Sequence, residues 1–223
     1  MAEICNKASF AQALKRCKDE FPEHYKFWPR TWVVPDDLSA LESKKRIPTL
    51  IFKPDEGTQG DGIYIVQSVA DLKRKIGYLK DAKSAIVQRY ISDPLTLDGK
   101  KFDFRVYVCV LGVDPFRIYL CREGIVRFCS DDYEKPNPRN LHRATGHLTN
   151  YSLNKVSQNF VHGEDGSKRL LSAVFETLEK QCGVDTSKLW GSICDLVMRT
   201  MVAIQPTLVA STNAAMSTAG TGV

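Results

Sequence analysis

A lysine followed by a glycine-rich segment is the first candidate for chemistry in this 223-residue chain. Lys53 precedes a stretch in which Gly57, Gly60 and Gly62 fall within six residues. Glycines let backbone N–H groups approach a phosphate closely, and a lysine can neutralise its charge. The spacing is not that of a Walker A loop, which needs GxxxxGK[ST] at the start of a helix. Taken alone, such a hairpin is more often structural than functional.

A charged strand is the second candidate. In Lys101-Phe102-Asp103-Phe104-Arg105, alternate side chains point to opposite faces, so the lysine, aspartate and arginine share one face. Three charged groups on one face are costly to bury without partners. Two interpretations remain open: an exposed face with mutual ion pairs, or a face directed at a polyphosphate.

Two further candidates are weaker by themselves. Arg127 would be neutral surface in most proteins. The segment 147–155 is dense in hydroxyls and amides, and it either forms turns or binds phosphate and carboxylate groups. His142, His147 and His162 have no metal-ligand spacing, so we expect no zinc site.

The elements that would position these residues follow from the periodicity of apolar residues. The pattern predicts helices over residues 9–20, 68–79, 167–181 and 193–204. It predicts strands over 50–52, 63–66, 85–91, 102–110, 116–121 and 125–129, with Glu123-Gly124 at a turn. The polar stretch 131–166 is long enough to indicate a functional loop, and residues 209–223 are a low-complexity tail expected to be disordered.

The composition, 43% hydrophobic and 26% charged, is that of an ordinary soluble protein. The longest nearly apolar run, residues 106–113, is too short to span a membrane, and the first residues do not resemble a signal peptide. The seven cysteines include no CxxC pair, so we expect reduced thiols in a cytosolic protein. The net charge of +5 permits an acidic partner or a nucleotide without requiring either.

Taken in chain order, these segments resemble the tubulin–tyrosine-ligase-like polyglutamylases, which are ligases of the ATP-grasp fold. The blocks that carry the resemblance are Tyr25–Trp32, Lys53–Ile63, Gln88–Ile91, Lys101–Tyr107, Glu123–Phe128 and His147–Asn154. The resemblance extends from about Phe21 to Pro206. It implies an α/β fold of the ATP-grasp type, with an antiparallel sheet and flanking helices. Residues 1–208 would be part of a catalytic domain without the family's N-terminal subdomain and with an incomplete C-terminal part.

The resemblance also implies roles for individual residues. Lys53 and Arg105 would be catalytic. ATP would be bound by residues from four of the blocks: Lys53, Gln59, Gly60, Gln88, Arg89, Tyr90, Ile91, Lys101, Phe102, Asp103, Thr149 and Asn150. The incoming glutamate would be bound by Gln59, Arg127, Tyr151, Ser152 and Lys168.

The reaction that the resemblance implies is ligation of free L-glutamate to glutamate side chains of tubulin C-terminal tails. Transfer of the γ-phosphoryl of ATP to the acceptor carboxylate gives an acyl phosphate, which the amine of glutamate attacks. The protein would contribute positioning and charge neutralisation, together with Mg²⁺. No metal ligand is assigned, because the acidic and Glu-x-Asn blocks of the family are not found after Pro206. Asp103 is the nearest remaining acid.

Other functions were weighed against this one. Without those acids, the chain would be a catalytically inactive module that binds tubulin or nucleotide. A protein kinase is excluded, because His142-Arg143-Ala144 is not an HRD motif and Asp103-Phe104-Arg105 is not DFG. A glycine ligase is disfavoured by Arg127, since glycine has no side-chain carboxylate. We expect a monomer in the cytoplasm and cytoskeleton, at a cilium or basal body, with no nucleic-acid or membrane partner.

Overall fold

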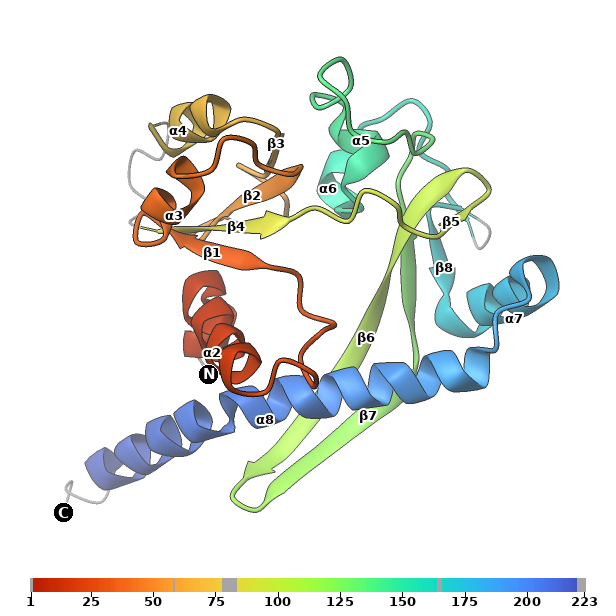
Figure 1. Cartoon of the computed structure of the whole chain (residues 1–223). Helices are drawn as coiled ribbons and strands as arrows, with labels where there is room; N and C mark the ends of the chain where they lie inside the picture. The colour runs from red at the N-terminus through yellow and green to blue at the C-terminus, as the bar shows by residue number, and fades with distance from the viewer. Residues whose placement is uncertain (1, 58, 78–83, 164–165, 220–223) are drawn as a thin grey trace.

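The computed structural model describes residues 2–57, 59–77, 84–163 and 166–219. Its helices are α1 (Ala2–Cys5), α2 (Lys7–Glu20), α3 (Leu38–Glu42), α4 (Val69–Gly77), α5 (Ala144–His147), α6 (Tyr151–Asn154), α7 (Leu171–Cys182) and α8 (Thr186–Ala219). Its strands are β1 (Thr31–Val34), β2 (Leu50–Pro54), β3 (Tyr64–Val66), β4 (Ala85–Arg89), β5 (Thr96–Leu97), β6 (Lys100–Val113), β7 (Phe116–Phe128) and β8 (Lys168–Leu170). The strands form two four-stranded antiparallel sheets, ordered β1-β4-β2-β3 and β5-β6-β7-β8 (Figure 1).

The first sheet is covered by helices on both faces. Leu50 and Phe52 alternate with Ile51 and Lys53, and they pack with Leu41 of α3 and Leu72 of α4 in one core. On the other face, Val33 and Ile86 contact Ala8 and Ala11 of α2. Lys53 is the register partner of Ile86, so its side chain starts from this second face.

The second sheet is dominated by the long β6–β7 pair. Near its base, α7 buries Leu171, Val174 and Leu178 against Val126 and Phe128. Toward its far end, α8 packs Met201, Ile204 and Leu208 against Val110, Phe116 and Ile118, and also against Ala13 of α2. Figure 1 shows α8 crossing from α7 past the β6–β7 pair to α2. The helix therefore joins the two halves of the protein.

The turn predicted at Glu123-Gly124 is wrong, because β7 continues through it. Gly124 lies opposite Val106, and a Cβ at this glycine would stand 2.6 Å from the carbonyl oxygen of Arg105. The glycine therefore allows a close approach between two strands and does not form a hairpin. The register shifts between Val106 and Val108, next to this contact.

Helix α7 begins four residues later than predicted. Lys168–Leu170 forms β8, which pairs with Ile125–Arg127 of β7. The sheet edge thus takes residues that would otherwise begin the helix. The predicted stop at Gly183 is confirmed, since this glycine has a φ of 63° and its N–H donates to the carbonyl of Glu179. Helices α2 and α4 and the β2–β3 hairpin are also confirmed, whereas Leu79, the predicted end of α4, lies outside the described residues.

Helix α8 is longer than predicted. It includes Pro206 and continues to Ala219, although we expected order to end after Leu208. Packing of Ile204 and Leu208 holds the helix on both sides of the proline. Beyond it, Ala210, Ala214 and Ala215 are strong helix formers, and this explains why the helix continues while Met216 is 70% exposed.

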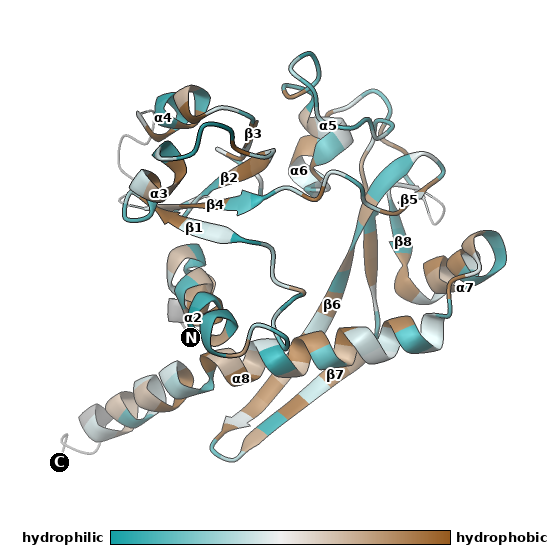
Figure 2. Ribbon diagram, viewed as in Figure 1, coloured by the Kyte–Doolittle hydropathy of each residue, from teal (hydrophilic) through white to brown (hydrophobic). Residues whose placement is uncertain are grey.

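The same helix bears on the expectation that no segment could span a membrane. Thr186–Ser217 is long and apolar enough to do so by length and composition alone. Figure 2 shows brown and pale residues along most of α8. Core helices of soluble proteins pass the same test, and one face of α8 is packed against β6, β7 and α2. The expectation rested on the longest unbroken apolar run, and the apolar residues of Thr186–Ser217 are interrupted by polar ones.

Candidate active site

Lys53, which precedes the glycine-rich loop, is half-buried and has a neutral hydrogen-bond partner. The Nζ of Lys53 donates to Oε1 of Gln88 at 3.0 Å, and Nε2 of Gln88 donates to Oγ1 of Thr31 at 2.8 Å. Burial lowers the pKa of Lys53 from 10.5, and the charges of Lys101 and Lys7 lower it further. Burial and the neighbouring lysines therefore make the charged form of Lys53 less favourable than that of a solvated lysine.

A second lysine reaches the same place from the other sheet. The Nζ of Lys101 donates to the hydroxyl of Tyr90 and to the carbonyl of His147, both at 3.0 Å. It also lies 4.3 Å from the centre of the Tyr90 ring. Burial lowers the pKa of Lys101, and burial together with the charge of Lys101 lowers the pKa of His147. Among the residues that the structure describes, neither Lys53 nor Lys101 forms an ion pair. Two such lysines match a polyphosphate.

The glycine-rich loop rests on α6. A Cβ at Gly60 would stand 2.8 Å from Cδ1 of Leu153 and 2.9 Å from Cγ of Asn150, and its φ is 96°. The hydroxyl of Ser152 donates to the carbonyl of Gln59. Only glycine fits such a close approach with a positive φ. The structure thus brings Gln59 and Gly60 into contact with Asn150 and Ser152, which lie about 90 positions later in the sequence.

Asp103 and Arg127 form a bidentate ion pair across the β6–β7 ladder. The Nε of Arg127 donates to Oδ1 of Asp103 at 2.8 Å, and its terminal nitrogen donates to Oδ2. The hydrogen bond to Asp103 raises the pKa of Arg127. The ion-pair interpretation of the charged strand is therefore partly confirmed, since Asp103 has an ion pair, whereas a face directed at a polyphosphate stays a prediction.

The remaining basic residue predicted to bind glutamate lies next to this pair. Lys168 is the register partner of Arg127 on β8, and its Nζ stands 3.5 Å from the centre of the Tyr151 ring. Tyr151 is 41% exposed, so the face that these residues share is open to solvent. An anion bound here would meet two cations from neighbouring strands.

The other predicted residues are placed less tightly. Arg105 is exposed on β6, and Arg89 and Ile91 are exposed at the end of β4 and just after it. Thr149 is half-buried directly before Asn150. Phe102 was predicted to bind ATP. Its side chain packs with Phe104 and Phe128 in the second core, on the face opposite Lys101, and so points away from the site. Phe102 has only its main chain to offer a ligand.

Two residues of the site were missed by the sequence analysis. Thr31 orients Gln88, and it is a buried polar residue at the start of an otherwise apolar strand. His147 is buried, and its Nδ1 lies 3.2 Å from the Tyr90 hydroxyl. The sequence places His147 at the start of the polar segment 147–155 but gives it no individual role. A polar residue inside an apolar strand was the available signal for Thr31.

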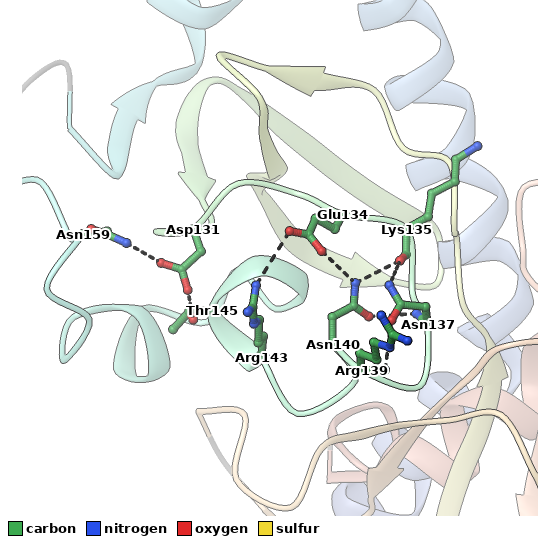
Figure 3. A network of polar contacts seen from close by, with 9 residues as sticks. All are labelled: Asp131, Glu134, Lys135, Asn137, Arg139, Asn140, Arg143, Thr145 and Asn159. Carbon is green, nitrogen blue, oxygen red and sulfur yellow. Dashed lines mark hydrogen bonds and ion pairs between the residues drawn. The ribbon is translucent and has the colours of Figure 1, made fainter.

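The functional loop predicted at 131–166 is organised by its own polar side chains (Figure 3). Glu134 lies between Asn140 and Arg143, at 3.3 and 3.7 Å. The carboxylate of Asp131 accepts from Thr145 and from Asn159, and these bonds lower its pKa. Since α5 follows directly, the network fixes the helix whose last residue, His147, contacts Lys101.

The described residues can be compared with the ligands that a metal ion requires. No cluster of three or more metal-binding side chains occurs in the described part of the chain, and Asp103 is engaged by Arg127. These residues therefore do not fit a Mg²⁺ ion, which requires carboxylate oxygens. A cavity of about 830 Å³ lies between β3, α4 and residues 138–148, and Ile65 and Leu148 are among its lining residues, whereas Lys53 and Lys101 are not.

Comparison with known proteins agrees with this geometry. The model of the tubulin-tyrosine ligase family matches residues 1–219. Tubulin polyglutamylase TTLL11 of Homo sapiens is 40% identical over 220 residues, which cover 93% of this chain and 31% of that protein. Tubulin polyglutamylase ttll6 of Danio rerio is 42% identical, and the probable beta-tubulin polyglutamylase of Tetrahymena thermophila is 37% identical. These alignments cover 93% of this chain in each case, and 26% and 18% of the two relatives.

This chain thus spans less than a third of the length of these curated relatives. The match nevertheless includes both sheets and the residues between them. The mixed α/β architecture with antiparallel sheets agrees with the ATP-grasp type of fold expected from the sequence. The chain belongs to the tubulin-tyrosine ligase family.

Proposed function

We propose that this chain binds ATP between its two sheets and ligates glutamate to glutamate side chains of tubulin C-terminal tails. The observation that carries the proposal is the pair Lys53 and Lys101, two half-buried lysines whose hydrogen bonds go to neutral oxygens. Burying a cation without a counter-ion is costly, so such a pair is expected where an anionic ligand supplies the charge. The names of the similar proteins, tubulin polyglutamylases, support the choice of reaction and acceptor.

In this proposal the nucleotide is held from both sheets. Lys53, Lys101, Thr149 and Asn150 bind its phosphates, and the loop at Gln59 and Gly60 closes over them. The segment 88–91 connects the two sheets and holds the adenine mainly through its backbone, while Asp103 and the main chain of Phe102 line the ribose side. ATP supplies the phosphoryl group that activates a carboxylate. Arg105, exposed on the same face as Lys101 and Asp103, neutralises charge on the acceptor carboxylate together with Lys53.

The glutamate that is added binds next to Arg127. A guanidinium can hold a carboxylate through two parallel hydrogen bonds, as it does with Asp103 here. Lys168, Tyr151, Ser152 and Gln59 surround the same place and hold the remaining groups of the amino acid. This arrangement favours glutamate over glycine, because the guanidinium needs a side-chain carboxylate to bind.

A second candidate function rests on the metal test. Mg²⁺ is the ion expected with ATP, but the residues described do not provide its ligands. A catalytically inactive module that binds tubulin or nucleotide through the lysine pair is therefore the alternative. In either case the expected location is the cytoplasm and the cytoskeleton, at a cilium or basal body, and the expected state is a monomer.

One experiment separates these functions. The chain is incubated with ATP, Mg²⁺, radiolabelled glutamate and microtubules, and ATP binding is measured in parallel by calorimetry. Incorporation of label supports the ligase. Binding of ATP without incorporation supports the inactive module. Absence of ATP binding by the folded chain contradicts the ligase, and absence of both ATP binding and co-sedimentation with microtubules contradicts the inactive module as well.

A further inference from the structure

Lys7, the first residue of α2, contacts the glycine-rich loop from outside the two sheets. Its Nζ donates to the carbonyl oxygen of Asp55 at 2.9 Å and to that of Gly57 at 3.2 Å. These carbonyls belong to the beginning of the loop, whereas Gln59 and Gly60 contact α6. The loop is therefore held at two places, and Lys7 provides one of them.

Asp55 is bound to the start of the same helix. Its carboxylate accepts from the backbone N–H of Ala8 at 3.0 Å, from the side chain of Asn6, and from the hydroxyl of Ser84 at 2.9 Å. A carboxylate at a helix N-terminus is favourable, because it meets unpaired N–H groups and the positive end of the helix dipole. This attachment sets the position of α2 relative to the loop, so that Lys7 can reach Gly57.

Lys7 also adds positive charge near the lysine pair. Its charge contributes to lowering the pKa of Lys53, after burial and the charge of Lys101. The two carbonyl contacts of Lys7 do not neutralise it, and none of the ion pairs between described residues includes it. Three lysines from α2, β2 and β6 thus act on the space beside the loop.

We propose that Lys7 is a positioning residue for the nucleotide: it holds the first carbonyls of the glycine-rich loop and raises the positive potential felt by a polyphosphate. This inference rests on the proposed function, because it requires ATP to bind beside Lys53. Its chemistry predicts that the contribution of Lys7 grows with the number of phosphates, since both the loop and the charge act on the phosphate chain.

The test compares nucleotides that differ only in phosphate number. Lys7→Met is expected to weaken ATP binding by about tenfold, ADP binding by less, and AMP binding hardly at all, because a charge-assisted contact contributes on the order of a tenfold effect. Lys7→Arg, which keeps the charge and the donors, is expected to stay within about threefold of the unchanged chain. Calorimetric titration gives the affinities, and hydrogen exchange of residues 59–63 reports on the loop.

Lys15→Met is the matched control. It removes the same charge from the same helix, but Lys15 binds Asp37, at 3.0 Å, on the side of β1. Lys7→Gln, which keeps a hydrogen-bond donor, is the second variant if Lys7→Met does not fold, and circular dichroism checks both. The control is expected to bind ATP as the unchanged chain does.

The outcomes separate this inference from the proposed function. If the unchanged, folded chain binds no nucleotide, the proposed function is wrong and the inference with it. If ATP binds normally to Lys7→Met or Lys7→Gln, only the inference is wrong. An equal loss for ATP and AMP, or a failure of Lys7→Arg to restore affinity, indicates a general structural role and also overturns the inference.

Discussion

Asp103 and Arg127 face each other in register across β6 and β7 and share a bidentate ion pair. The aspartate is 37% exposed and the arginine 20%, so the pair lies at the rim of the site. The expected roles of the two residues differ, since Asp103 would contact the nucleotide and Arg127 the amino acid. In the proposed function, the nucleotide and the amino acid would therefore bind to the two members of one ion pair.

Replacing Arg127 should separate the two substrates. In Arg127→Ala we expect the KM for glutamate to rise at least about tenfold and that for ATP to change by less than about threefold, because a bidentate contact to a carboxylate is lost. Incorporation of labelled glutamate into microtubules at varied substrate concentrations measures both. Arg122→Ala, at an exposed arginine of the same strand, is the control. An equal rise in both KM values would contradict the role assigned to Arg127.

Replacing Lys53 should affect binding more than folding. Lys53→Met removes a buried cation that is repelled by Lys101, but it leaves Oε1 of Gln88 without its donor. These effects oppose each other, so we expect the free energy of unfolding to change by no more than about 1 kcal/mol. ATP affinity should fall at least about tenfold. Urea unfolding and calorimetry measure the two quantities, and Lys73→Met, at an exposed lysine paired with Glu42, is the control. Unimpaired ATP binding would count against the lysine pair.

Lys53 and Lys101 should each make a contribution to the stability of the ligand-free chain that rises with pH in the alkaline range, while Cys129 and Tyr90, whose pKa values burial raises, make contributions of the opposite sign. Burial lowers the pKa of Lys53 and of Lys101 below the unfolded value of 10.5. Between each lowered pKa and 10.5 these lysines bind more protons in the unfolded chain than in the folded one, so their contribution to the free energy of unfolding increases with pH. The penalty for charged lysines is complete below this window and absent above it, at about 1.4 kcal/mol per pKa unit.

Urea unfolding at a series of pH values through this window measures the effect. Lys53→Met should show a smaller slope than the unchanged chain, because one of the two lysines no longer titrates. ATP affinity should fall over the same window, since the folded lysines lose their charge. A slope that is the same in both proteins would show that Lys53 is charged normally in the fold.

Gly60 should not tolerate a side chain. In Gly60→Ala the new Cβ would stand 2.8 Å from Leu153 and 2.9 Å from Asn150, at a φ of 96°. We expect a loss of about 1–3 kcal/mol in the free energy of unfolding, or displacement of the loop from α6 with weaker ATP binding. Thermal unfolding and hydrogen exchange distinguish these results. Gly77→Ala is the control, because no residue that the structure describes lies within 4 Å of a Cβ there. Identical behaviour of the two variants would argue against the contact with α6.

Local patterns predicted most of the elements and the family. Short apolar runs marked β2, β3 and β4, alternation of apolar residues marked β6, and helical spacing marked α2 and the first part of α8. The blocks from Tyr25 to Asn154 identified the family, whose model matches residues 1–219. The errors occurred where a segment's conformation depends on its neighbour: Gly124 allows a close strand contact, and residues 168–170 extend a sheet edge.

The sequence alone therefore determined which residue types are available for binding an anion and roughly in which elements they lie. Only the tertiary structure decided which of them meet. Lys53 and Lys101, from different sheets, lie close enough for the charge of one to affect the other, and Asp103 forms an ion pair with Arg127. The side chain of Phe102 lies in a core, and Lys7 contacts the glycine-rich loop. The physical reason is that side-chain direction along one strand follows a local rule with a period of two residues. Contact between separate sheets and helices depends on how their apolar faces pack, and no local pattern encodes that.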